Sequence, residues 1–285
     1  MKSDGEHSMG ELRYSKGDFT LSYRKSLSHN MPHNHFHSTY EIFYLMNGNR
    51  EFFIKDRTFL IQEGDVIIIA PNIVHRTTNS ALPKHERLIV NIPKDDLTAI
   101  NTSYLEIMHP LFEQEYMIVR SPFQEQVFVE GIARNILQEM QEKKPGFEIY
   151  AQTLVLQLLI YCCRHVKQHV SEPLEFPSPM HERISRVAGY INSHYMDELS
   201  LQLLAERFYV SPYYLSRSFK EATGFAFVEY LNMVRVKESK KLLEETKLKV
   251  NLIAERVGFG SVTHFGRVFK AVTGHPPLFF RKASK

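Results

Sequence analysis

The sequence is poor in cysteine and has no long apolar run. Its only cysteines, Cys162 and Cys163, are neighbours in an apolar stretch. Two adjacent cysteines cannot build a disulfide framework or a cysteine-rich zinc site, and they are most simply reduced packing residues. No segment approaches the ~18 uninterrupted apolar residues of a membrane span, and the first 30 residues contain no apolar signal core. We therefore expect a cytoplasmic protein with no membrane partner.

A length of 285 residues favours two domains over one. The small net charge conceals an asymmetry between the two ends of the chain. Residues 180–285 hold 17 Lys and Arg against 10 Asp and Glu, whereas residues 1–179 hold 18 against 22. A basic C-terminal third predicts a polyanionic partner for that part. A chance distribution of surface charge is the alternative.

Residues 19–92 have the pattern of short β-strands. The runs EIFYLM, REFFIK, TFLIQ, DVIIIA and RLIVNI are separated by the turn signals NGN, EGD and PNI. Strands at this spacing, with no helical periodicity between them, predict a barrel or a sandwich.

Two helices are expected after the strands. Ser121-Pro122 with Gln124 is typical of a helix N-cap with a capping box, and this helix should run to about residue 142. A second helix, 147–169, is apolar over most of its circumference, so it is buried in its own domain or against another subunit. We expect these helices to form a homodimer interface. Three prolines then mark 171–180 as a linker.

The C-terminal third contains an internal repeat. RSFKEATG at 217–224 returns as RVFKAVTG at 267–274. Each copy is the second helix of a helix–turn–helix unit, in the ranges 200–222 and 250–273, and each ends at a Thr-Gly helix stop. Ser200, Ser211 and Ser261 are expected to cap helices. An unbroken helix over 227–245 should join the units and span roughly 27 Å, which approaches one turn of B-DNA.

Each second helix carries an outward polar stripe that suits a DNA major groove. Arginine there can reach guanine edges, while a cap and a lysine hold phosphates. The stripes are Tyr213, Ser216, Arg217 and Lys220 in the first copy, and Thr263, Gly266, Arg267 and Lys270 in the second. An α-solenoid with charged outer faces is the alternative, but a solenoid generally needs three or more copies.

Residues 181–282 resemble the AraC/XylS-type DNA-binding domain of bacterial transcription regulators. The matching stretches are LAERFYVSPYYLSRSFKEATG and IAERVGFGSVTHFGRVFKAVTGHPP. Gly266 departs from the polar residue usual at its position. Pattern and resemblance together imply that double-stranded DNA is contacted by Ser211, Tyr213, Tyr214, Ser216, Arg217, Lys220, Ser261, Val262, Thr263, His264, Arg267 and Lys270. The resemblance also implies an activator, with RNA polymerase as a further partner.

The N-terminal part resembles the cupin motifs. His35-Phe36-His37 with Glu41 and Gly48 is similar to the first motif, and Gly64 with His75 and Asn79 to the second. His29 departs from the glycine that opens the first motif, and Pro71 and Ile73 depart from the second. A cupin-like sensor joined to this DNA-binding domain implies a regulator switched by a small molecule, often a sugar or a related metabolite.

The residue types and their spacing also support an interpretation of these positions that does not depend on the resemblance. On one strand, His35, His37, Glu41 and Phe43 would point to the same face. With His75 from a later strand, the histidines and Glu41 could hold a first-row divalent metal. The same groups could instead line an effector pocket that needs no metal, or the histidines could be structural. The expected effector-binding residues are His35, His37, Glu41, Phe43 and His75.

The sequence thus predicts an α+β protein with two domains. Residues 1–170 form a cupin-like β-barrel with two following helices, and residues 181–285 form an all-α domain of two helix–turn–helix units. A metal-dependent cupin enzyme fused to a DNA-binding domain is an alternative, but no separate nucleophile or general base is evident, so we expect no catalysis. An architectural DNA binder would not need the large N-terminal body.

Overall fold

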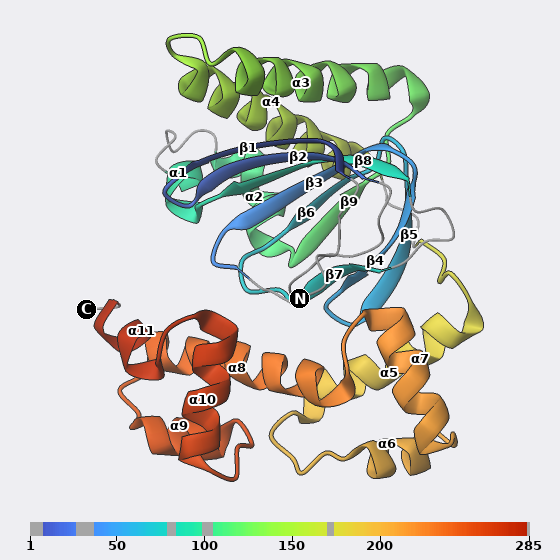
Figure 1. Ribbon diagram of the computed structural model, residues 1–285, viewed down its shortest axis with the longest axis vertical. Helices are drawn as coiled ribbons and strands as arrows, with labels where there is room; N and C mark the ends of the chain where they lie inside the picture. The colour runs from blue at the N-terminus through green and yellow to red at the C-terminus, as the bar shows by residue number, and fades with distance from the viewer. Residues whose placement is uncertain (1–7, 27–36, 79–83, 99–104, 170–173, 284–285) are drawn as a thin grey trace, which may run out of the picture.

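The computed structural model describes residues 8–26, 37–78, 84–98, 105–169 and 174–283. A β-rich half with its own helices lies against a helical half (Figure 1). The strands are β1 (Ser8–Lys16), β2 (Phe19–Ser26), β3 (Tyr40–Asn47), β4 (Asn49–Ile54), β5 (Arg57–Gln62), β6 (Val66–Ile69), β7 (His75–Thr78), β8 (His85–Ile92) and β9 (Tyr116–Val119). The five runs expected from the sequence correspond to β3, β4, β5, β6 and β8.

The strands form two antiparallel sheets. The larger has the order β1-β2-β8-β3-β6-β9 and the smaller the order β5-β4-β7. Phe43, Phe52 and Ile67 belong to the apolar core between the sheets. On β2, alternate residues divide between the two faces, because successive side chains of a strand point in opposite directions. Phe19 and Leu21 pack towards the helices, which leaves Thr20, Ser22 and Arg24 on the inner face.

The helices of the N-terminal half are α1 (Lys94–Thr98), α2 (Leu105–Glu113), α3 (Phe123–Glu142) and α4 (Phe147–Gln168). Helices α2, α3 and α4 cover the outer face of the large sheet. Leu154, Leu158 and Cys162 of α4 are buried in this core. Packing within the domain therefore accounts for the apolar character of α4.

The expected capping role of Ser121 is wrong. Pro122 occupies the N-cap position of α3, without a side-chain cap. Ser121 is buried, and its hydroxyl accepts a hydrogen bond of 2.6 Å from Tyr161 on α4. The hydroxyl of Ser121 therefore has a tertiary partner in place of the local one that a cap requires.

The segment expected to be a linker is docked over most of its described length. Arg57 of β5 donates a hydrogen bond to the Leu174 carbonyl oxygen, and its guanidinium carbon lies 4.3 Å from the centre of the Phe176 ring. Helix α5 (Pro179–His194) begins inside the expected linker range. The connection therefore follows the surface of the small sheet.

The helical half contains α5, α6 (Leu201–Arg207), α7 (Pro212–Thr223), α8 (Phe227–Glu245), α9 (Val250–Arg256), α10 (Val262–Thr273) and α11 (Pro277–Ala283). Helices α6 and α7 form the first helix–turn–helix unit, and α9 and α10 the second. The hydroxyls of Ser200, Ser211 and Ser261 accept the expected capping hydrogen bonds. Gly224 and Gly274 end α7 and α10 in the left-handed conformation, each at φ 79°.

Helix α8 joins the two units and holds them at its opposite ends (Figure 1). Its 19 residues give a length of roughly 28 Å, as the sequence predicts. None of the helices in the described ranges combines the length and the apolar character of a membrane span.

Candidate functional site

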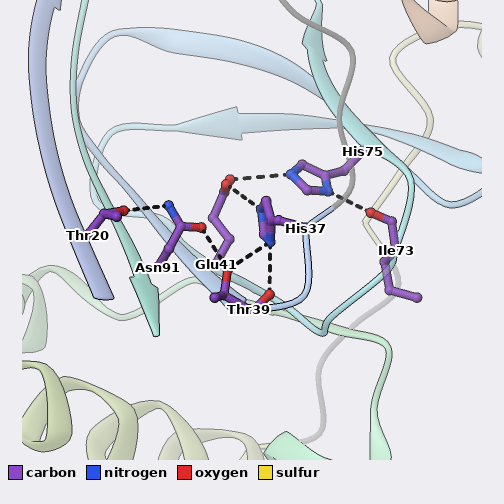
Figure 2. A network of polar contacts seen from close by, with 7 residues as sticks. All are labelled: Thr20, His37, Thr39, Glu41, Ile73, His75 and Asn91. Atoms are coloured by element: carbon purple, nitrogen blue, oxygen red, sulfur yellow. Dashed lines mark hydrogen bonds and ion pairs between the residues drawn. The ribbon is translucent and has the colours of Figure 1, made fainter. Parts of the chain in front are cut away.

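A histidine–glutamate cluster lies between the two sheets (Figure 2). Glu41 of β3 lies at its centre and is 2% exposed. Its Oε2 is 3.0 Å from Nε2 of His37, and its Oε1 is 3.6 Å from Nε2 of His75, the first residue of β7. The structure thus brings three of the predicted effector residues together.

Backbone carbonyls fix the orientation of both imidazoles. Nδ1 of His37 donates to the Thr39 carbonyl over 2.9 Å, and Nδ1 of His75 donates to the Ile73 carbonyl over 2.8 Å. Each ring therefore turns its Nε2 towards Glu41. Burial alone would raise the pKa of Glu41, but the charges and hydrogen bonds of His75 and His37 hold it well below the usual range. Burial lowers the pKa of His75, but Glu41 outweighs it and the pKa is raised.

The same three side chains form a donor set that suits a divalent metal. The ligand atoms of His37, Glu41 and His75 lie within 4.8 Å of one another. Two imidazole nitrogens and a carboxylate oxygen are a ligand set of first-row transition metals. Metal-ligating histidines commonly donate their other ring nitrogen to a carbonyl, as both histidines do here. The residues present therefore fit a metal as well as a polar effector.

The expected strand geometry of this region needs correction. On a continuous strand, positions 37 and 41 would be about 13 Å apart. His37 instead precedes β3, and a bend at Ser38 and Thr39 returns its ring to Glu41. Phe43 is fully buried in the core and packs edge-on against Phe52, with ring centres 5.1 Å apart. His35 lies outside the described residues.

Hydrogen bonds connect the cluster to the large sheet. Asn91 of β8 donates to Thr20 of β2 over 3.0 Å, and its side-chain oxygen accepts from the Thr39 hydroxyl over 3.4 Å. Thr39 in turn contacts His37 (Figure 2). A ligand that displaced His37 would therefore disturb both sheets.

The expected DNA-contacting residues are all exposed, on or directly before α7 and α10. Those of the first unit are Ser211, Tyr213, Tyr214, Ser216, Arg217 and Lys220; those of the second are Ser261, Val262, Thr263, His264, Arg267 and Lys270. The opposite faces hold Leu215 with Phe219 and Phe265 with Phe269, each pair buried. The helices thus present polar stripes and are held by apolar ones.

The small sheet packs directly against the first helix–turn–helix unit. Phe53 and Val74 belong to the same apolar cluster as Leu215 and Phe219 of α7. Arg76 of β7 donates to the Gly224 carbonyl at the end of α7. Its neighbour His75 has its side chain at the cluster between the sheets. Strand β7 therefore contacts the inner site with one face and the DNA-binding half with the other.

Hydrogen bonds add to this interface. Thr58 donates to the Ala222 carbonyl over 2.9 Å, and the buried Tyr230 hydroxyl of α8 donates to the Lys55 carbonyl. This contact was not predicted from the sequence. Phe52 and Phe53, adjacent on β4, are buried on opposite faces of the strand. Consecutive apolar residues of this kind indicate a strand covered on both sides.

The comparison with known proteins agrees with a division into an N-terminal β-rich half and a C-terminal helical half. Residues 16–159 match the family described as the AraC-like ligand binding domain, and residues 204–283 match a helix-turn-helix domain. The protein is a DNA-binding transcription regulator with an N-terminal ligand-binding domain. The chain belongs to the AraC family.

Individual relatives are distant. An uncharacterized HTH-type transcriptional regulator, YisR of Bacillus subtilis, is 24% identical over 86% of both chains. The bifunctional transcriptional activator and DNA repair enzyme AdaA of B. subtilis is 35% identical over 40% of this chain, and the alignment spans 54% of AdaA. Among solved structures, ToxT of Vibrio cholerae matches 92% of this chain and 98% of its own, at 15% identity and a TM-score of 0.39.

Proposed function

We propose that a small molecule bound between the two sheets controls how this regulator binds DNA. The supporting observation is the position of β7. His75 contacts Glu41 in the inner cluster, and the next residue, Arg76, contacts the last turn of α7. A ligand at the cluster would therefore act one residue away from the DNA-binding half.

The coupling requires a difference between two states. A ligand shifts a conformational equilibrium only by its differential affinity for the two forms, and coupling between sites is typically about 1–3 kcal/mol. A ligand that moved His75 would strain the hydrogen bond between Arg76 and Gly224. In the ligand-free form this interface restrains α7, and the ligand changes that restraint.

The test of this coupling begins with the selection of a DNA target. A duplex is selected from a random pool with the full chain, and metabolites are screened for a change in affinity for that duplex. His75→Ala should abolish the response, whereas His109→Ala, an exposed histidine, should respond as the parent does. A full response in His75→Ala would place the effector elsewhere.

Metal content distinguishes two forms of the pocket. A near-stoichiometric divalent metal in the purified protein, absent from His75→Ala, would support coordination by His37, Glu41 and His75. A metal-free parent whose response is lost in the variant would support direct contact between these residues and the effector. The proposed function holds in either case.

We also propose that the protein acts as a homodimer through α3 and α4. Phe123 and Val127 are one turn apart on α3 and are 81% and 63% exposed, and Ile149 of α4 is 69% exposed. Apolar side chains this exposed are common in protein interfaces. Sedimentation of Phe123→Ser/Val127→Ser should show a monomer at concentrations at which the parent and Leu60→Ser are dimers. A monomeric parent would remove the dimer from the account.

We further propose that the protein activates transcription through RNA polymerase. We also propose a cytoplasmic location, because that is where a bacterial regulator binds its DNA. We propose no catalytic activity. The inner cluster contains residues that metal-dependent cupin enzymes also use, but the contact between its strand and α7 is what a sensor requires and an enzyme does not.

A further inference from the structure

Three buried arginines, with a neutral histidine beside them, lie between the two sheets. Arg24 of β2 and Arg87 of β8 are directly opposite each other in the antiparallel register, as are Ser26 and His85. Arg50 of β4 contacts Nδ1 of His85 through its guanidinium. The exposed fractions are 6% for Arg24, 3% for Arg50, 9% for Arg87 and 6% for His85. Residues from three strands thus bring positive charge into one buried place.

Two acidic residues near this face have cationic partners of their own. Glu11 of β1 is opposite Arg24 but forms an ion pair with Arg13. Glu41 is held by the two imidazoles of the histidine–glutamate cluster. Among the described residues, the side chain of Arg87 has no hydrogen bond or ion pair, and its guanidinium carbon lies 5.9 Å from the centre of the Phe43 ring.

Burying the guanidinium of Arg87 is costly for the fold. Moving a charged side chain out of water is unfavourable unless an opposite charge or hydrogen bonds compensate for it. Burial lowers the pKa of Arg87 to about 10; the charge of Glu41 opposes this shift, and repulsion from Arg24 and Arg50 adds to it. The group is still charged at neutral pH. Stability would favour an apolar side chain at position 87, which suggests that the arginine has a role in binding.

We propose that Arg24, Arg50, Arg87 and His85 bind the anionic group of the effector, a carboxylate or a phosphate. This inference rests on the proposed function, because it names the chemical class of the molecule that the sensor recognises. A guanidinium presents parallel N–H donors that match both oxyanions. The buried position strengthens each contact, because the local dielectric constant is lower than in water. The histidine–glutamate cluster lies on the same inner face and can contact the rest of the effector.

The test is a thermal unfolding series on the full chain with inorganic phosphate, sodium acetate or sodium chloride at equal ionic strength. Phosphate, or phosphate and acetate, should raise the Tm in a saturable manner, since a ligand that binds only the folded state stabilises it. A phosphate effect alone assigns a phosphorylated effector, and an equal acetate effect assigns a carboxylate. Equal shifts in all three salts would overturn the proposal.

Variants locate the effect. Arg87→Met should remove the anion-dependent shift while its Tm without anion stays equal to or above that of the parent. Arg87→Lys keeps a charge but not the paired donors, and should weaken anion binding about tenfold. The controls Arg134→Met, at an exposed site on α3, and Arg267→Met, on the DNA-binding half, should keep the full shift. An unchanged shift in Arg87→Met would overturn the proposal.

DNA binding measured in parallel separates this inference from the proposed function. If the chain binds its selected duplex and responds to a metabolite, but Arg87→Met responds equally well, only the anion assignment fails. If no metabolite changes the affinity of the parent for DNA, the proposed function fails, whatever the anions do.

Discussion

The two helix–turn–helix units share a plan but differ in what surrounds them. The core of the first unit includes Phe53 and Val74 of the small sheet. Among the residues that the structure describes, the core of the second draws only on the helical half, with Val236, Phe265 and Phe269 among its members. An internal repeat in the sequence has therefore produced one unit that is docked on the sensor and one that is not.

This difference implies that the two units have different roles in regulation. Both units present a polar stripe, so both are equipped to contact DNA. Only the first lies where a change at His75 can reach its second helix through Arg76 and Gly224. Regulation that acts on α7, with α8 setting the distance to α10, would change how the pair of units fits two successive major grooves.

The turns of the two units also differ. The largest expected effect of a substitution is a loss of stability at the turn of the second unit. Gly258 has φ 90°, and a Cβ at this position would lie 2.8 Å from the carbonyl oxygens of Tyr195 and Met196. Gly258→Ala should destabilise the second unit by about 3 kcal/mol, through backbone strain and overpacking. Urea unfolding monitored by circular dichroism measures this. Gly260→Ala, where a Cβ meets nothing within 4 Å, is the control, and a similar loss in both variants would contradict the steric account.

The next comparison concerns the contacts that the two units are expected to make with DNA bases. Arg217→Ala and Arg267→Ala should each weaken binding to the selected duplex by about 1–3 kcal/mol and relax specificity in different halves of the site. Binding titrations with duplexes mutated in one half at a time measure both effects. Lys167→Ala, on α4 of the sensor half, serves as the control. If both arginine variants bind every sequence as the parent does, α7 and α10 are not the recognition helices.

A smaller effect is expected at the interface between the sensor and the first unit. Tyr230→Phe removes the hydroxyl that donates to Lys55 and contacts Asn192. The loss should be about 1 kcal/mol in the free energy of unfolding, the usual contribution of one hydrogen bond. Tyr150→Phe, at a half-exposed tyrosine, should leave stability unchanged. An unchanged stability in Tyr230→Phe as well would mean that this contact does not hold the halves together.

Helix ends were the features best predicted from the sequence, because their signals are local. The three serine caps, the two Thr-Gly stops and the bounds of α8 depend on neighbours within a few residues, and the structure confirms them. Ser121 shows the limit of such signals, because its hydroxyl pairs with Tyr161, 40 residues away, and does not cap α3.

Contacts distant in sequence were the hardest to predict. The parity of His37 and Glu41 assumed a straight strand, whereas a bend brings the two side chains together. The cationic cluster depends on the register that places Arg24 opposite Arg87, and strand periodicity does not define the register. The docking of β4 and β7 on α7 was likewise missed, although the adjacent Phe52 and Phe53 were a usable signal.

Hydrogen exchange on the full chain tests most directly whether the sensor contacts the first unit alone. Arg76→Met removes the hydrogen bond to Gly224 while keeping the length of the side chain. We predict faster amide exchange in the last turn of α7 and in β7, because protection reports local stability, and unchanged exchange in α9 and α10. Unchanged exchange in α7, or an equal increase in both units, would contradict the account.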